Sequence, residues 1–337
     1  MFPERKLPAI TGFTNNIALK TVMDNWPGTP VDQSGRFINL DGPTVLSMRM
    51  ILKHLIERNP QRESKKKDAW RIPVLTDDNW LNDETDKIVW LGHASFFIQL
   101  DGIRLVTDPV FGQLPMVKRH SPLPVDPGKL LNIDYILVTH AHYDHCDQKS
   151  LQLLSANNPR AHILCGLNLD RLIGKWINNP IHTAGWYQQY NNTGGLKITF
   201  VPSRHWANRG LFDANTTLWG GFVIEKADGC IYFSGDSGYG SHYKAIGQLF
   251  PRIDLALLGA GAYAPAWFMG KNHQDPYQAL QAFRDTGAQL FVPFHYGTFD
   301  MADEPMGETE QILNRLKAEG KMNDELKILK LGETLPV

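Results

Sequence analysis

Four apolar segments of this sequence each end in a side chain of a type that binds metal ions. The segments IDYILVTH, ITFVPSRH, CIYFSGD and LFVPFH end in His140, His205, Asp236 and His295. A strand that is covered on both faces reads as a continuous apolar run, so each segment is predicted to be a buried β-strand. Polar residues just beyond such strands lie at one rim of a sheet, where α/β folds build their sites. The sequence therefore predicts an α/β fold in which these strand ends meet.

The first of these strand ends opens a dense cluster of candidate ligands, because residues 140–145 read HAHYDH. Together with the other strand ends, the cluster supplies five imidazoles and two carboxylates: His140, His142, Asp144, His145, His205, Asp236 and His295. These ligand types suit zinc, and also iron or manganese. Seven ligands are too many for one tetrahedral zinc ion. They are most simply explained by two metal ions that share a carboxylate and keep room for water.

The remaining pattern indicates central sheets with helices outside. Asp101-Gly102 joins apolar runs at 87–100 and 103–111, which is a strong signal for a β-hairpin. Further strands are predicted within 133–140, 160–165, 196–205, 217–225, 229–236, 253–259 and 288–295, and helices at about 148–156, 168–177, 241–249 and 275–286. Hairpins followed by alternating strands and helices are typical of an α/β domain.

A domain boundary is predicted near residue 84. Residues 1–84 are expected to be an N-terminal extension that packs on a main domain formed by 85–337. Residues 43–58 have apolar positions at helical spacing, and we favour a helix packed on the main domain over a basic amphipathic helix on a membrane surface. The charged run 64–68 that follows, SKKKD, is expected to be a solvated loop.

Composition limits the classes of partner. Lys plus Arg number 34 and Asp plus Glu number 35, so nothing in the overall charge favours nucleic acid or an anionic membrane. Three cysteines form no disulfide framework, and the sequence shows neither a signal-peptide core nor a transmembrane run. We expect a cytoplasmic protein without nucleic-acid partners. Peripheral membrane contact and a homodimer stay open.

The motif HAHYDH, with His205, Asp236 and His295 downstream, resembles the HxHxDH pattern of the metallo-β-lactamase superfamily. The resemblance implies an αββα sandwich. One metal ion would take His140, His142 and His205, the other would take Asp144, His145 and His295, and Asp236 would bridge them. Asp147 matches an acidic position that follows the motif in many members, and we expect it to orient a ligand from outside the coordination shell.

Longer segments narrow the resemblance to one branch. The segments GAYAPAWFMGKNHQDP and FHYGTFDMADEP are similar to the branch of N-acyl-phosphatidylethanolamine-hydrolysing phospholipase D (NAPE-PLD), and the similarity covers roughly residues 70–305. It implies a dinuclear zinc hydrolase that cleaves a phosphodiester, such as that of a phospholipid, by a metal-bridged hydroxide. Asp144 and Asp236 would serve catalysis as ligands.

Roles near the substrate follow from the same resemblance. His273 would bind phosphate or protonate the leaving group, with a histidine at a helix start as the equally weighted alternative. Trp267, Phe268 and Met269 would line a cleft for acyl chains or, alternatively, belong to the core. Two other functions stay open: a hydrolase of the same fold acting on a lactone, amide or thioester, and a non-hydrolytic metal-binding protein. Cys146 is expected to be a small buried apolar residue.

Overall fold

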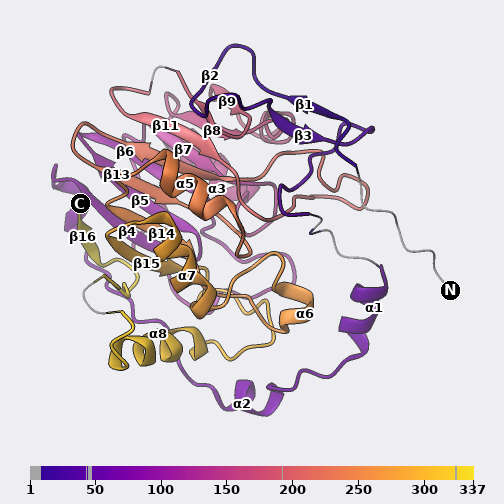
Figure 1. Cartoon of the computed structure of the whole chain (residues 1–337). Helices are drawn as coiled ribbons and strands as arrows, with labels where there is room; N and C mark the ends of the chain where they lie inside the picture. Colours follow the sequence, from indigo (N-terminus) through magenta and orange to yellow (C-terminus); the bar gives the residue numbers. More distant parts are fainter. Residues whose placement is uncertain (1–8, 43, 45–47, 192, 323–324) are drawn as a thin grey trace.

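Two seven-stranded β-sheets form the centre of the fold (Figure 1). The computed structural model describes residues 9–42, 44, 48–191, 193–322 and 325–337. The first sheet consists, in spatial order, of β16 (Thr334–Pro336), β4 (Lys87–Gly92), β5 (Ser95–Leu100), β6 (Ile103–Thr107), β7 (Tyr135–Val138), β8 (His162–Gly166) and β9 (Ile181–Ala184). The second consists of β15 (Leu290–Phe294), β14 (Leu255–Gly259), β13 (Cys230–Phe233), β12 (Gly221–Glu225), β11 (Lys197–Val201), β10 (Gln188–Gln189) and β2 (Lys20–Thr21). A separate ribbon pairs β1 (Gly12–Thr14) with β3 (Thr29–Val31).

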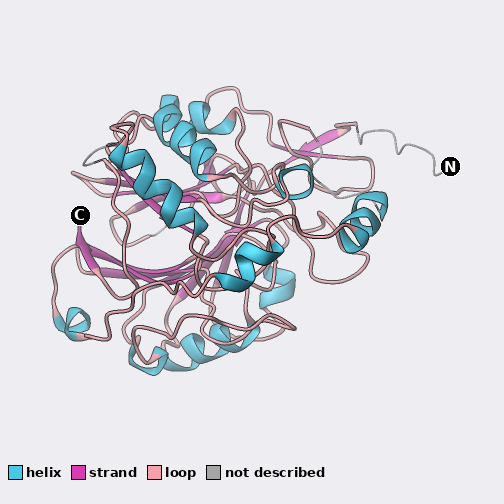
Figure 2. Ribbon diagram, turned by 90° about the horizontal axis from the view of Figure 1, so that it is seen from below, coloured by secondary structure: helices cyan, strands magenta, loops and turns pink. Residues whose placement is uncertain are grey.

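Helices flank the sheets on both outer sides, as Figure 2 shows. They are α3 (Gln148–Asn157), α4 (Asp170–Ile173), α5 (His242–Leu249), α7 (Pro276–Thr286) and α8 (Glu308–Ala318), with the short 3₁₀ helices η1 (Asn79–Asn82) and η2 (Pro127–Lys129) in connections. The arrangement is the predicted αββα sandwich, so the predicted fold class is confirmed. Within the described part of the chain, no helix is long and apolar enough to cross a membrane.

Aromatic side chains fill the space between the sheets. Phe96 of β5 lies edge-to-face against Phe294 of β15, with ring centroids 5.7 Å apart, and 6.2 Å from Phe233 of β13. All three are fully buried. Each buried aromatic of this kind stabilises a fold by several kcal/mol relative to alanine, so this layer holds the two sheets, and the strand ends they carry, in a fixed relation.

The hairpin at Asp101-Gly102 is confirmed, and the structure adds a second one. β5 and β6 are antiparallel, and both turn residues have positive φ (49° and 76°), as a type I′ turn requires. The run 87–100, expected to form one side of that hairpin, contains two strands, because β4 and β5 are joined by a tight turn. His93 (φ 53°) and Ala94 make that turn, next to Gly92 (φ 113°) at the end of β4, and the apolar pattern conceals it because both strands are buried on both faces.

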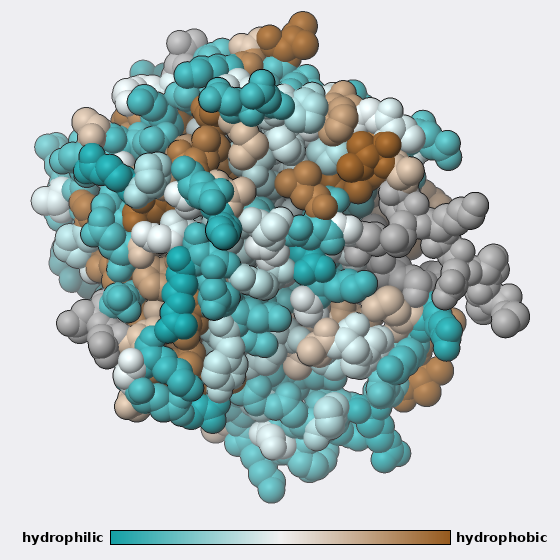
Figure 3. Space-filling view, in the orientation of Figure 1, coloured by the Kyte–Doolittle hydropathy of each residue, from teal (hydrophilic) through white to brown (hydrophobic). Residues whose placement is uncertain are grey.

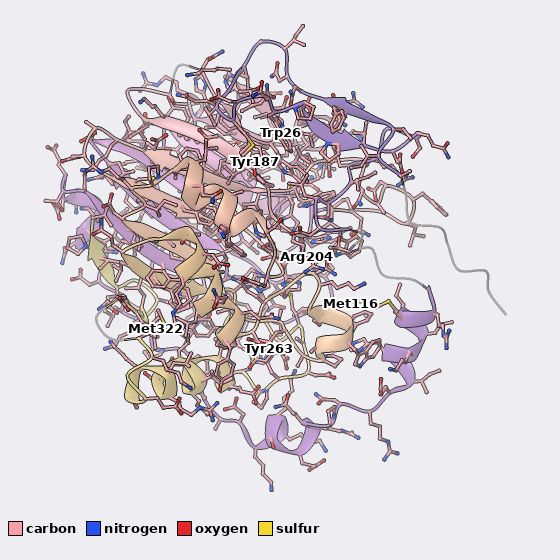
Figure 4. The ribbon with its side chains drawn as sticks, in the orientation of Figure 1. Trp26, Met116, Tyr187, Arg204, Tyr263 and Met322 are labelled. Atoms are coloured by element: carbon pink, nitrogen blue, oxygen red, sulfur yellow. The ribbon has the colours of Figure 1, made fainter. Side chains whose placement is uncertain are left out.

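The segment before residue 84 contacts the second sheet and the site. β2 extends that sheet by pairing with β10, and Trp26 lies 4.8 Å, centroid to centroid, from the ring of Tyr187 (Figure 4). The boundary at residue 84 stays a prediction. The predicted helix within 43–58 is observed as α1 (Met48–Ile56); positions 43 and 45–47 lie outside the described residues. The run 64–68, expected as a loop, is mostly helical in α2 (Arg62–Lys67).

Candidate metal centre

The structure brings the seven predicted ligands together at the carboxyl ends of strands from both sheets. The HAHYDH segment follows β7 of the first sheet, whereas His205, Asp236 and His295 follow β11, β13 and β15 of the second. His140, His145, His205, Asp236 and His295 are at most 3 % exposed. Such a collection of polar side chains is costly to bury without a compensating partner.

Three imidazoles form the first group of donor atoms. Nδ1 of His142 lies 2.8 Å from Nε2 of His140 and 3.1 Å from Nε2 of His205. Oδ2 of Asp236 is 3.9 Å from the His140 nitrogen and 3.7 Å from the His205 nitrogen. Donor atoms at these separations could surround one ion.

A second group adjoins the first through Asp236. Oδ2 of Asp144 lies 3.5 Å from Nε2 of His145 and 3.6 Å from Nε2 of His295. The two carboxylate oxygens of Asp236 are each 3.1 Å from one of these imidazole nitrogens, Oδ2 from His145 and Oδ1 from His295. Asp236 is therefore the side chain that reaches both groups, because its carboxylate lies within 4 Å of four of their five imidazoles.

The electrostatics of the first group suit metal binding. Burial lowers the pKa of His142 to about 4. Burial, together with neighbouring imidazoles, also holds the pKa values of His140 and His205 well below the usual range, although Asp236 acts in the opposite direction. All three rings are therefore neutral near pH 7, and each keeps a lone pair for a cation.

The second group is dominated by its carboxylates. Burial opposes charge on His145, but Asp236, Asp144 and Asp108 outweigh it and raise the pKa of His145 well above the usual value. Burial would likewise raise the pKa of Asp236, but His145 and His295 hold it well below the usual range. Without a metal ion, the two imidazoles thus take up the positive charge that the carboxylates demand.

Buried atoms without hydrogen-bond partners test whether a metal fits. Among the described residues, Nε2 of His145, Nε2 of His295 and Oδ1 of Asp236 are buried and lack such a partner. Buried polar atoms are almost always satisfied. These three atoms belong to candidate ligands of the second group and lie at the shared centre, so the donor set fits metal ions in both position and chemistry.

Residues behind the ligands hold their rings in place. Asp108, after β6, accepts from Nδ1 of His145 at 2.7 Å, and its carboxylate also binds the backbone N–H and the hydroxyl of Thr139. Oγ1 of Thr139 is in turn 2.9 Å from Nδ1 of His140. Asp108 therefore orients ligands of both groups. Asp108 could have been found from the sequence by the same pattern that identified the candidate ligands, because it directly follows the strand-like run IRLVT.

The carboxylate of Asp147 caps a helix, although the sequence predicted that it would orient a metal ligand. Its side chain caps α3, accepting from the backbone N–H of Ser150 at 2.9 Å and from its hydroxyl at 2.6 Å. These are the contacts of an N-cap aspartate. Among the contacts described, the carboxylate behind the ligand rings is that of Asp108.

His93 and Arg209 complete the surroundings. Nε2 of His93 lies 3.0 Å from Oδ2 of Asp144, so this histidine lies at the floor of the site and orients a candidate ligand. Arg209 donates to the carbonyls of Ala141 (3.1 Å) and Cys146 (2.7 Å), and thereby binds both ends of the ligand-bearing turn. Nothing in the local sequence around Arg209 predicted this contact, which spans more than 60 positions.

Cys146 is fully buried, and burial raises the pKa of its thiol to about 12. It is a protonated apolar side chain at neutral pH, as expected from the sequence.

His273 lies beside the two groups. Its Nδ1 is 3.8 Å from Oδ2 of Asp236, and its ring is 5.2 Å from those of His205 and His295. The start of α7 is capped by Asp275, with Gln278 completing a capping box, so His273 is not the capping residue. The alternative of a histidine that merely begins the helix is thereby weakened.

The apolar cluster lies on α6 (Ala266–Met269), four residues before His273 at its end. Trp267, Phe268 and Met269 are half-buried. His54 of α1 stacks on Phe268 at 4.2 Å, and Nζ of Lys53 lies 4.0 Å from the centroid of the Trp267 ring. These side chains are covered in part by α1, and they are not part of the buried core.

An αββα sandwich with a buried histidine and aspartate cluster at the strand ends is the architecture of a metal-binding protein. The family model for the β-lactamase superfamily domain matches residues 103–296. The chain is 30 % identical over 282 residues to NAPE-PLD 1 of Caenorhabditis elegans, covering 79 % of this chain and 78 % of the relative. It therefore belongs to the metallo-β-lactamase superfamily, as a NAPE-PLD-like member.

Two further comparisons agree with this assignment. A metal-dependent hydrolase of Hyperthermus butylicus is 29 % identical over 257 residues, covering 72 % of this chain and 96 % of the relative. Among solved structures, a metallo hydrolase from Ignicoccus hospitalis superposes with a TM-score of 0.57 at 24 % identity, covering 74 % of this chain and 97 % of that one. The chain is thus a metal-dependent hydrolase by family, with a buried cluster able to bind metal.

Proposed function

We propose that this chain is a dinuclear zinc phosphodiesterase of the phospholipase D type, with an N-acyl-phosphatidylethanolamine or a related phospholipid as substrate. The observation that carries the proposal is the position of Asp236, whose two oxygens lie between two groups of donor atoms. His140, His142 and His205 would hold one ion, Asp144, His145 and His295 the other, and Asp236 both. Similarity to the Caenorhabditis elegans NAPE-PLD supports the choice of a phosphodiester.

The metal ions, when bound, would supply an activated water and neutralise charge on a phosphoryl oxygen. The chain's own residues do the rest. Asp108 and Thr139 keep the rings of His145 and His140 oriented, and His93 holds Asp144. Because Asp108, Thr139 and His93 are buried, the positions of the ligands they contact are set before substrate arrives.

Burial lowers the pKa of His273 to about 4, so its ring is neutral near pH 7. We propose that it takes a proton from the attacking water and passes it to the departing alkoxide. His273 lies beside Asp236 and is largely buried, with a side chain that is 14 % exposed. A donor in this position could reach the leaving-group oxygen of a substrate bound at the shared centre. Trp267, Phe268 and Met269 are proposed to contact the acyl chains of that substrate.

Asp236→Asn tests the proposal. The amide keeps the shape of the side chain but removes the charge that two dications require. We expect wild-type protein, loaded with zinc and then desalted, to hold about two zinc ions per chain, because seven ligands exceed one tetrahedral set. The variant should keep its fold by circular dichroism but lose one ion and most of its phosphodiesterase activity. Unchanged metal content and turnover would falsify the bridging role.

A product-resolved assay separates the alternative functions. Zinc-loaded protein is offered N-acyl-phosphatidylethanolamine, a soluble phosphodiester and a lactone at equal concentrations. Release of phosphatidic acid and N-acylethanolamine supports the proposal. Hydrolysis of the lactone alone would favour a carbonyl substrate, and turnover of none of them would favour a non-hydrolytic metal-binding protein.

A further inference from the structure

Residues 49–71, which comprise α1, α2 and the chain that follows, carry a concentration of positive charge. We call this segment the basic strap. It holds eight Lys and Arg against three Asp and Glu, a net charge of +5, whereas the whole chain has a net charge of −1. The rest of the chain is therefore acidic, and the near-neutral total hides a strongly asymmetric distribution.

Most of this charge faces solvent. Arg49, Arg58, Arg62 and Lys67 are exposed. Lys65 is an exception, because its Nζ lies 2.5 Å from Oδ1 of Asp300 and fixes α2 to the loop after β15. Exposed ion pairs such as that of Lys66 with Glu63 contribute little, so the strap presents a cationic surface.

α1 also exposes apolar side chains that the protein leaves uncovered. Leu52 is 48 % exposed and Ile56 is 81 % exposed. They are four residues apart and so lie on the same face of the helix. Figure 1 shows α1 and α2 at the outer edge of the molecule, and Figure 3 shows hydrophilic side chains along this edge with a hydrophobic patch at its outer end.

The strap is connected to the metal centre through α6. Lys53 and His54 contact Trp267 and Phe268 from outside. At the other side of α6, the carbonyl of Met269 accepts from the backbone N–H of His273, whose ring lies beside Asp236. A partner that binds the strap is therefore separated from the candidate ligands by the short helix α6.

We propose that the basic strap docks this protein on the surface of an anionic phospholipid bilayer. The cations bind the lipid phosphates, and Leu52 and Ile56 enter the interface, where their apolar surface leaves water. Nucleic acid would also attract the cations, but it offers no apolar phase for the two aliphatic side chains, so the lipid surface is the better fit. The proposal deepens the phospholipase function and rests on it for the reaction, whereas docking itself can be measured without hydrolysis.

Co-sedimentation with vesicles tests the proposal. Metal-loaded wild-type protein is mixed with vesicles of phosphatidylglycerol and phosphatidylcholine, or of phosphatidylcholine alone. We expect binding to the anionic vesicles, weakened by salt, and much weaker binding to the neutral ones. The triple variant Arg62→Gln, Lys66→Gln, Lys67→Gln should bind the anionic vesicles about 10²-fold more weakly, since each cation near such a surface is worth about fivefold.

Matched variants separate the strap from general charge effects. Lys149→Gln, Lys175→Gln, Lys244→Gln removes the same charge from exposed positions outside the strap and should bind as the wild type does. Leu52→Gln, Ile56→Gln leaves the charge unchanged and should weaken binding by at least about tenfold. Circular dichroism of each variant shows whether the fold is kept.

The possible outcomes separate this proposal from its alternatives and from the proposed function. Equal binding to neutral vesicles, or equal losses in the two triple variants, would show that the strap is not the anionic-lipid site. Wild-type binding by Leu52→Gln, Ile56→Gln, together with tight strap-dependent binding of duplex DNA, would favour nucleic acid. Strap-dependent vesicle binding without any phospholipid hydrolysis would uphold the dock while contradicting the proposed function.

Discussion

Asp108 and Asp147 illustrate how two aspartates near one metal cluster differ in what they do. Asp108 is fully buried and binds the back of a ligand ring, whereas Asp147 is half-buried and caps a helix. The sequence offers a signal for each, because Asp108 follows the run IRLVT and Asp147 precedes a predicted helix, but only the folded chain decides which ring Asp108 contacts.

Replacing each aspartate separately checks this division. Asp108→Asn should lower zinc affinity or activity by about 10–100-fold, the usual cost of losing an orienting partner behind a ligand. Asp147→Ala should cost about 0.5–2 kcal/mol of stability through loss of the cap, with zinc affinity unchanged. Chelator competition measures the first effect and thermal unfolding the second. Equal losses of zinc affinity in the two variants would restore Asp147 to the role predicted from the sequence.

His273 also has a role that kinetics can resolve. If it donates a proton, His273→Ala should slow hydrolysis of an alkyl phosphodiester by about 10²–10⁴-fold. A nitrophenyl phosphodiester, whose anion leaves unaided, should be slowed far less. Both rates and the bound zinc are measured on one preparation. Equal slowing of the two substrates would point to phosphate binding instead, and no slowing would remove His273 from the mechanism.

At the scale of elements, short connections position the site more than the long helices do. The ligands lie on loops that directly follow strands, and α6 is a single helical turn between β14 and α7. α6 is half-buried, with α1 on one side and His273 on the other. We therefore expect α6 to contact the apolar part of a substrate.

Trp267→Ala tests that expectation. Burying one large apolar side chain against a lipid tail is worth about 1.5–3 kcal/mol, so the variant should weaken a long-chain substrate by about one to two orders of magnitude. A short soluble phosphodiester should be affected little. Trp26→Ala is the control, because Trp26 is another half-buried tryptophan, packed on Tyr187 instead of α6. Equal losses on both substrates in Trp267→Ala would show that α6 serves packing alone.

For the molecule as a whole, the candidate metal centre lies where the two sheets meet. Its candidate ligands follow β7 in one sheet and β11, β13 and β15 in the other. Metal ions bound there would connect the two halves of the sandwich. Because the complete site forms only in the folded state, metal binding would add to the stability of that state.

Metal removal should therefore lower the unfolding temperature. Free zinc at 100 times its dissociation constant is expected to stabilise the fold by about 2.7 kcal/mol per site. Calorimetry of chelated protein, before and after zinc is restored, measures the shift. The Asp236→Asn variant should respond more weakly. An unfolding temperature that does not depend on zinc would contradict binding at this centre.

The amino-acid sequence by itself determined the α/β fold class, the four strands that precede the candidate ligands and the seven candidate ligands. Buried strands leave continuous apolar runs, and each ligand-bearing end combines such a run with His or Asp. These are local signals, readable without knowing which strands are neighbours.

The tertiary structure alone decided which side chains stand behind the ligands. Asp108 meets His145 across 37 positions, and Arg209 meets Cys146 across 63. The contact of α1 with α6 likewise follows from how distant segments pack, whereas the turn at His93 and Ala94 and the cap by Asp147 are local contacts that the sequence pattern did not reveal. Hydrogen bonds and ring contacts form between spatial neighbours, and only the packing of the two sheets creates those neighbours.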